Sequence, residues 1–165
     1  MPPVRVGKPG STQRVTFVPE LLVLPGNARA RVLPAATVDG QLKVPEKVDY
    51  VGWWDGSAYA GDPFGSTVIA GHVDSATEGI GFFHRLWRIK VGDVVILRAG
   101  SHRLSYRISD VRRVDRRALA TDSQAFDQTD PHRLILITCI GEYRRDRGGY
   151  QKNLVVTGQP LGRAG

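Results

Sequence analysis

Residues 133–139 read RLILITC, an almost unbroken apolar run that ends at the sole cysteine of the chain. A run of this kind predicts a central β-strand that is buried on both faces. The next apolar run, YQKNLVVT at residues 150–157, predicts the last strand, and the charged, glycine-ended segment 140–149 predicts the loop before it. We expect the two strands to pair as a hairpin, which places Cys139 where a buried strand gives way to a polar loop.

Short apolar runs bounded by turn residues continue upstream of this hairpin. Strands are predicted at residues 14–24, 30–38, 66–71, 93–98 and 103–114, and short helical segments at 82–89 and 123–126. The 19 glycines and 10 prolines are spread along the chain, as is typical where many strands are joined by turns. We therefore expect an all-β fold, either a closed β-barrel or a sandwich, with one or two short helices. Residues 1–13 lack periodicity and are predicted to be a flexible lead-in before one domain at 14–160.

The composition is that of one globular domain, with 165 residues, 41% hydrophobic and 24% charged. The formal net charge is +7, but the basic residues are scattered and accompany no RNA-binding or zinc-finger signature. A solvated basic surface is therefore favoured over a nucleic-acid site. One cysteine excludes an intramolecular disulfide, and the histidines and acidic residues lack ligand spacing, so we expect no metal and no cofactor. No apolar run approaches the length of a membrane-spanning helix.

Cys139 and His72 are the candidate reactive pair. His72 follows the apolar run STVIAG at residues 66–71 and precedes a glycine-containing loop, so it is positioned much as Cys139 is. A thiol is mostly protonated at neutral pH, and an imidazole can take its proton and later protonate a leaving amine. A lone cysteine is more often a small core residue, and position alone leaves that interpretation open.

An acyl transfer also needs hydrogen-bond donors for the oxyanion. The segment after the cysteine and the strand that follows it offer Arg144, Arg145, Arg147, Gln151 and Lys152. Because the two strands are expected to pair, one of these long side chains can return beside the sulfur. Arginine is best suited, since it stays charged and presents a planar fork of donors. Spacing alone does not decide which residue does so.

Two blocks of the sequence carry a resemblance to sortases. Leu136-Ile137-Thr138-Cys139 resembles the Leu-x-Thr-Cys signature of that family, and residues 70–75 (AGHVDS) resemble the Gly-His-Val-Asp-Ser block of the class F sortases of actinobacteria. Together the two blocks are far more specific than the first alone. Further class F-like blocks follow the family's order, at residues 51–54, 83–86, 92–95, 150 and 153–156. The likeness runs from about residue 20 to residue 158.

The resemblance implies an eight-stranded sortase-like β-barrel with a His–Cys–Arg site at its edge. It also implies a two-step transpeptidation, in which Cys139 attacks the Thr–Gly carbonyl of an LPXTG-type sorting signal and forms a thioacyl enzyme. His72 would protonate the departing amine and then deprotonate the acceptor, and Thr138 would line the substrate groove. Asp74 is expected to cap its loop or, less favoured, to orient His72.

The arginine of the site is carried over onto Arg147, the nearest arginine before Tyr150. Arg144, Arg145 or Lys152 in its place is left open. The three tryptophans are expected in core or rim packing, with a substrate-groove role open for one of them.

The resemblance also implies partners and a location. We expect LPXTG-bearing surface proteins and a peptidoglycan precursor or other primary amine as acceptor, no nucleic acid, and a monomer. The enzyme would work at the extracytoplasmic face of the cell membrane or cell wall, with a natural N-terminal anchor that this chain lacks. Two alternatives are a catalytically weak or silent β-barrel that binds cell-wall peptides or other anionic partners, and a nucleic-acid-binding barrel suggested only by charge and strand content.

Overall fold

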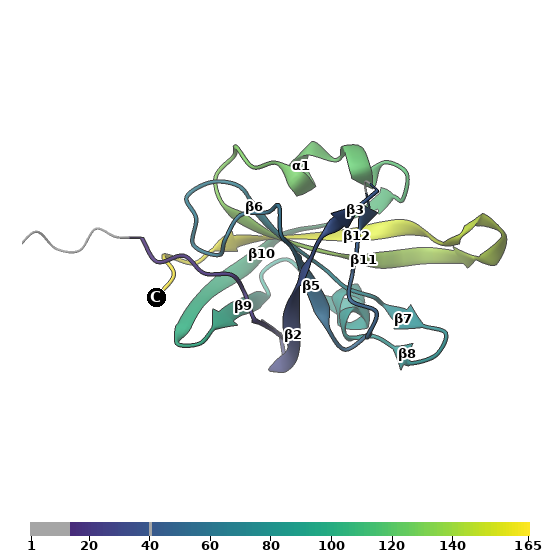
Figure 1. The fold of residues 1–165 in the computed structure, drawn as a ribbon, viewed down its shortest axis with the longest axis horizontal. Coiled ribbons are helices and arrows are strands. Elements are labelled where there is room, and N and C mark those ends of the chain that lie inside the picture. The colour runs from purple at the N-terminus through teal and green to yellow at the C-terminus, as the bar shows by residue number, and fades with distance from the viewer. Residues whose placement is uncertain (1–13, 40) are drawn as a thin grey trace, which may run out of the picture.

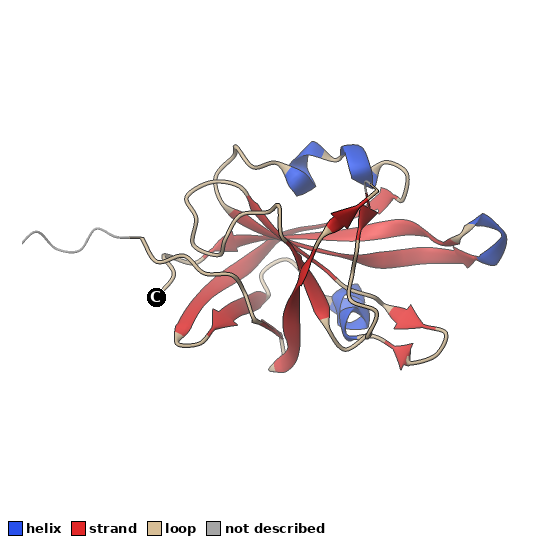
Figure 2. Cartoon of the chain, in the orientation of Figure 1, coloured by secondary structure: helices blue, strands red, loops and turns tan. Residues whose placement is uncertain are grey.

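Eight strands close into a β-barrel in the computed structural model, which describes residues 14–39 and 41–165 (Figure 1; Figure 2). Their order around the barrel is β1-β2-β5-β6-β11-β12-β10-β9. The strands are β1 (Leu21–Leu24), β2 (Ala28–Ala35), β5 (Val51–Trp54), β6 (Ser66–Ala70), β9 (Val94–Ala99), β10 (His102–Asp115), β11 (Arg133–Arg144) and β12 (Gly149–Pro160). Neighbours are antiparallel except for β2 with β5 and β6 with β11, which run parallel. The expected all-β, eight-stranded barrel is confirmed.

Two small sheets and four short helices accompany the barrel in the part of the chain that is described. The sheets pair β3 (Thr37–Val38) with β4 (Gln41–Leu42), and β7 (Asp74–Ser75) with β8 (Gly79–Ile80). The helices are η1 (Phe82–Arg88), η2 (Leu119–Thr121) and η3 (Arg145–Arg147), which are 3-10 helices, and α1 (Ser123–Phe126). Both helical segments predicted from the sequence are confirmed, as η1 and α1. The Asp122 side chain accepts the main-chain N–H groups of Gln124 and Ala125 and so starts α1.

The central strand β11 is apolar on both faces because each face contributes side chains to a different hydrophobic cluster. Leu134 and Leu136 point into the barrel core. Ile135 and Ile137 point outward into a second cluster. That second cluster is covered by η2 and α1, which run along the upper edge of Figure 1, and by residues of the β3–β4 region. The nearly continuous apolar run at the start of β11 is therefore explained by burial on two sides.

The segment after Cys139 is a strand rather than the predicted loop. β11 continues to Arg144 and β12 returns beside it, so the pair forms an arm that extends beyond the barrel on the right of Figure 1. A bulge between Ile140 and Tyr143 interrupts the register, and Gly141 there adopts a φ of 90°, which glycine tolerates. The sequence pattern stops being apolar because most arm side chains are exposed, although main-chain pairing continues.

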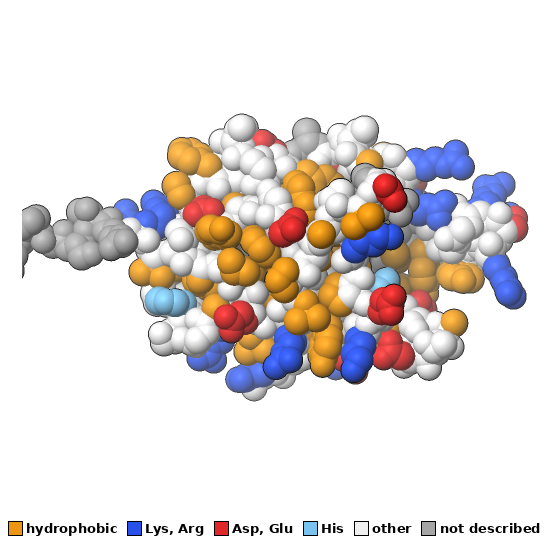
Figure 3. Space-filling model, viewed as in Figure 1, with side chains coloured by type: hydrophobic (Ala, Val, Ile, Leu, Met, Phe, Trp, Pro, Cys, Tyr) orange, Lys and Arg blue, Asp and Glu red, His pale blue; other side chains and the backbone are white. Residues whose placement is uncertain are grey.

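Charged and hydrophobic side chains share the surface of the domain (Figure 3). Figure 3 shows Lys and Arg side chains spread over one face among Asp and Glu side chains, with several at the end of the β11–β12 arm. Residues 1–13, predicted to be a flexible lead-in, lie outside the described residues. No helix within residues 14–39 and 41–165 has the length and apolar character needed to cross a membrane.

Candidate functional site

The thiol of Cys139 lies at the end of a row of outward-pointing side chains on β11. Alternate residues of a strand share a face, so Ile135, Ile137 and Cys139 point the same way. The two isoleucines are buried, whereas Cys139 is half-buried. The row leaves the covered outer layer at the cysteine, and the cysteine lines a pocket of about 400 Å³ there.

His72 reaches the same pocket from the end of β6. In the parallel β6–β11 pair, Ala70 lies opposite Ile137. The pairing continues past the strand end, since the Gly71 N–H donates to the Ile137 carbonyl over 3.1 Å. Two residues further along each chain are His72 and Cys139, and both line the pocket. One parallel register thus brings the two predicted residues to the same place.

Thr138 and Gly71 fix this crossing of the two strands. The buried Thr138 hydroxyl donates to the Gly71 carbonyl over 2.8 Å, and Thr138 also lines the pocket. A Cβ on Gly71 would come within 2.7 Å of the Phe83 ring and 2.9 Å of the Val51 side chain. Only glycine therefore lets β6 approach its neighbours this closely and deliver His72 to the pocket.

The pocket has an apolar part and a polar end. The apolar part is lined by Leu42, Val44, Leu119, Phe126 and Ile137. The polar end is lined by His72, Arg116, Cys139 and Asn153. Asn153 lies opposite Cys139 in the β11–β12 ladder, and its amide donates to the Thr138 carbonyl over 3.3 Å. Such a pocket can hold an apolar chain segment next to a nucleophile.

The surroundings of Cys139 favour the protonated thiol over the thiolate. Burial is the main cause that raises the pKa of Cys139 above its ordinary value, and the negative charge of Asp74 raises it further. The positive charge of Arg116 works in the opposite direction and lowers this pKa. Because the thiolate is the nucleophile, a proton acceptor such as His72 in the same pocket is the natural complement.

A second set of contacts approaches Cys139 from the η1 side. The Trp87 indole N–H donates to the Cys139 carbonyl oxygen over 2.9 Å. The Trp87 and Tyr150 rings meet edge to face, with their centroids 6.3 Å apart. The Tyr150 hydroxyl donates to the Asp74 carboxylate over 2.6 Å, which raises the pKa of Tyr150 to about 12. Asp74, predicted to cap its loop or to orient His72, thus bonds to the arm. Trp87 is a rim residue that bonds to the main chain of Cys139.

Arg147, carried over as the arginine of the site, lies in η3 at the tip of the arm. It lines a different pocket, whose other lining residues are Asp115, Arg116, Arg117, Asp146 and Gln151. Arg144, one of the alternatives, lies 3.6 Å from the Asp146 carboxylate and 4.0 Å from that of Glu142. Neither arginine is among the residues that line the pocket of Cys139.

Arg116 lines the Cys139 pocket and was missed in the sequence analysis. It follows β10, which pairs with β12 as far as Asp115 opposite Lys152. The long alternating run at residues 103–114 could have pointed to it. A strand of that length paired with β12 brings the residue that follows it, Arg116, beside the arm. The prediction from the sequence took its candidate cation only from the hairpin after Cys139.

Comparisons with known proteins agree with this architecture. The family model described as Sortase domain matches residues 24–161. Sortase A of Listeria monocytogenes is 17% identical with a TM-score of 0.65, over 89% of this chain and 88% of that one. Sortase C-1 of Actinomyces oris is 23% identical with a TM-score of 0.63, over 86% and 73% of the two chains. Sortase C of Streptococcus pneumoniae is 17% identical with a TM-score of 0.65, over 89% and 70%. These structures share the fold, and no curated protein sequence matches the chain significantly.

Proposed function

The chain belongs to the sortase family, and we propose that this sortase-type transpeptidase uses Cys139 and His72 to cleave an LPXTG-type sorting signal between Thr and Gly. The product would be transferred to a cell-wall amine. The observation that carries the proposal is the single pocket that both residues line, beside an apolar groove. A buried core cysteine, the other interpretation of Cys139, is disfavoured because the residue is half-buried and borders this pocket.

The proposed first step forms a thioester. The thiol proton passes to His72, the thiolate attacks the Thr carbonyl carbon, and a C–S bond forms with a tetrahedral oxyanion. When the intermediate collapses, the Thr–Gly C–N bond breaks and His72 returns its proton to the departing glycine amine.

The proposed second step transfers the acyl group. A primary amine attacks the thioester and loses a proton to His72, the C–S bond breaks, and the Cys139 thiolate leaves. The new amide joins the surface protein to its acceptor. No external oxidant or cofactor is needed for either step.

The shape of the pocket supports a sorting signal as the substrate. The apolar lining by Leu42, Val44, Leu119 and Phe126 suits the Leu-Pro end of such a signal, since aliphatic side chains gain most from burial there. The thiol at the polar end then lies near the Thr carbonyl. We propose that Thr138 supports the site through its bond to Gly71, which fixes the chain just before His72.

Location, class and partners are proposed on the same basis. We assign the protein to class F because of the sequence blocks at residues 51–54, 70–75 and 153–156. Its partners would be surface proteins that carry the signal and a peptidoglycan precursor or similar amine. Work on these substrates requires the extracytoplasmic face of the membrane or the cell wall.

The test is cleavage of a fluorogenic LPXTG peptide with and without triglycine as the amine. Wild type is expected to cleave it and to form the triglycine adduct, which mass spectrometry identifies. Cys139→Ala should retain less than about a hundredth of this activity, because no thioester can form. Cleavage by Cys139→Ala at wild-type rates would refute covalent catalysis by this residue. Peptide binding without turnover by the wild type would favour a catalytically silent binding barrel.

A further inference from the structure

We infer that Arg116 supplies the positive charge that stabilises the Cys139 thiolate and the oxyanion on the substrate carbonyl. The inference rests on the proposed acyl transfer, and it gives the role expected of Arg147 to a residue from another part of the chain. Arg116 lines both the pocket of Cys139 and His72 and the neighbouring pocket, whereas Arg147 lines the neighbouring pocket and is not among the residues that line the first.

The register of three strands places Arg116 on the face of the sheet that carries Cys139. The β10–β12 pairing extends past the strand end, since the Arg116 N–H donates to the Gln151 carbonyl over 3.0 Å. Asn153 lies opposite Cys139, and Gln151 is two residues from Asn153 on β12. Residues opposite one another, and alternate residues along a strand, share a face of a sheet. Arg116, Gln151, Asn153 and Cys139 therefore belong to one face.

The guanidinium of Arg116 is held in place by groups that do not cancel its charge. Its Nη1 donates to the Gly148 carbonyl over 3.0 Å and its Nη2 to the Arg147 carbonyl over 2.8 Å. Both acceptors are neutral, and within residues 14–39 and 41–165 no carboxylate forms an ion pair with this side chain. A guanidinium has five N–H donors, so two such bonds leave others for a developing oxyanion.

The tip of the arm is shaped around this guanidinium. A Cβ on Gly148 would come within 2.9 Å of the Arg116 Nη1, and Gly148 has a φ of 83°, which favours glycine. The turn therefore presents its carbonyls to Arg116 at close range. The arm thus holds the guanidinium of Arg116 in one position beside the pocket. A surface arginine without such bonds would be mobile.

The other candidates on the arm are turned away, paired or uncharged. Lys152 lies opposite Ile140, so it belongs to the opposite face from Cys139. Gln151 shares the face of Cys139 but is neutral, and its amide donates to the Gly149 carbonyl over 2.7 Å. Arg144 lies between two carboxylates, those of Glu142 and Asp146.

Four elements contribute the titratable and charged groups around the thiol. They are His72 after β6, Asp74 on β7, Tyr150 on β12 and Arg116 after β10. Asp74 raises the pKa of the thiol and Arg116 lowers it, so the two side chains oppose each other. Removing Arg116 leaves the burial and Asp74 uncompensated.

Two measurements on Arg116→Gln test the inference, with Arg117→Gln as the matched control. Arg117 is the adjacent exposed arginine and does not line the Cys139 pocket. The pH profile of iodoacetamide alkylation reports the sole cysteine, and Arg116→Gln should shift it to higher pH and slow the reaction near neutral pH about fivefold. Peptide turnover should fall about a hundredfold, mainly in kcat. Arg117→Gln should leave both unchanged.

A relocated charge separates an electrostatic role from a structural one. The double variant Arg116→Gln with Gln151→Arg returns a guanidinium to the same face, and we expect it to recover at least about a tenth of the lost turnover and the alkylation profile. A role limited to clamping the arm tip would not be rescued in this way. Equal alkylation profiles and turnover for Arg116→Gln and Arg117→Gln would overturn the inference, as would a loss confined to Arg147→Gln. A shifted alkylation profile in a protein that cleaves no peptide would uphold the role of Arg116 at the thiol and refute the proposed function.

Discussion

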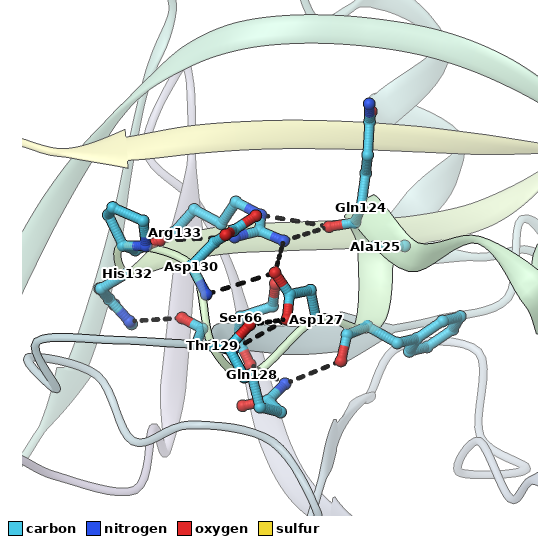
Figure 4. Close-up of polar contacts among 12 residues, drawn as sticks. Ser66, Gln124, Ala125, Asp127, Gln128, Thr129, Asp130, His132 and Arg133 are labelled. Atoms are coloured by element: carbon cyan, nitrogen blue, oxygen red, sulfur yellow. Dashed lines mark hydrogen bonds and ion pairs between the residues drawn. The ribbon is translucent and has the colours of Figure 1, made fainter.

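The first part of β11, residues 133–139, has two ends that are built in opposite ways. At its start, Arg133 is almost fully buried, and its guanidinium donates to the main-chain carbonyls of Gln124 and Pro131 and lies 4.0 Å from the Asp127 carboxylate (Figure 4). The neighbouring His132 ring bonds through one nitrogen to the Gly65 carbonyl and through the other to the Tyr106 hydroxyl. At its end, Cys139 is half-buried on a pocket.

The difference teaches how one strand supports both folding and chemistry. Buried polar groups at the start of β11 are bonded to the connection that precedes the strand, which fixes where the strand begins. Cys139 and His72, at the other end, are positioned by main-chain register, and both line the pocket. The start of β11, the satisfied end where the polar groups are hydrogen-bonded, therefore fixes the strand register. The position of Cys139, at the open end beside the pocket, depends on that register.

The largest expected effect lies at the open end. His72→Ala should reduce kcat/KM for peptide cleavage about a thousandfold, because both proton transfers lose their carrier. Its Tm should match that of the wild type within the error of a thermal scan. A clear loss of Tm in His72→Ala would show that this end of the strand also contributes to stability, against the division of roles described above. His102→Ala, at an exposed position on β10, is the matched control and should keep near-normal turnover.

At the satisfied end the effect should fall on stability. Arg133→Met removes the donors to the Gln124 and Pro131 carbonyls and leaves Asp127 without its cation. We expect a loss of about 3 kcal/mol in the free energy of unfolding, measured with urea. Arg103→Met, at an exposed position on β10, is the control. A urea midpoint equal to that of the control would contradict the contribution of Arg133 and its hydrogen bonds to stability.

Tyr106→Phe tests a single bond in the same region. Tyr106 is fully buried and its hydroxyl lies 2.7 Å from His132 Nε2. Because the other ring nitrogen faces the Gly65 carbonyl, it carries the proton, and Nε2 accepts from Tyr106. The variant leaves Nε2 unbonded and should lose about 1 to 2 kcal/mol of stability. Unaltered stability would mean that this bond contributes little, and cleavage by the folded variant should stay normal.

Trp87→Phe tests the hydrogen bond between the Trp87 indole and the main chain of Cys139. The change removes the N–H that donates to the Cys139 carbonyl but keeps an aromatic ring near Tyr150. Turnover should fall a few-fold, about the effect of losing one positioning hydrogen bond. Steady-state kinetics measure it, and Trp54→Phe, in the outer cluster, is the control. Identical kcat in both variants would remove Trp87 from the positioning of Cys139.

Asp74→Asn should produce the smallest change, and in the direction opposite to Arg116→Gln. The Asp74 charge raises the pKa of the Cys139 thiol, so its removal should lower that pKa and shift the alkylation profile to lower pH. We expect the shift to be small, because Asp74 is exposed to solvent. A shift to higher pH would contradict the assigned sign.

Much of this architecture could be predicted from the sequence because strand periodicity and two-sided burial leave clear patterns. The run at residues 133–139 indicated the central strand, and the helical turns of η1 followed from apolar spacing. The short helix α1 was placed within a polar connection. The extension of β11 to Arg144 was missed, since an arm held by main-chain pairing needs no apolar side chains. Arg116 was missed because its position depends on which strands are neighbours in the barrel. The roles of His72, Cys139 and Arg147 stay predictions.

The indole of Trp87 has a spectroscopic consequence. It is 38% exposed, its N–H is bonded to the carbonyl of the reactive cysteine, and a tyrosine ring stands beside it. Its emission should therefore respond when an acyl group loads onto the sulfur. In a protein whose other two indoles are replaced by phenylalanine, this native fluorophore would report formation and decay of the thioester in stopped flow without any attached dye.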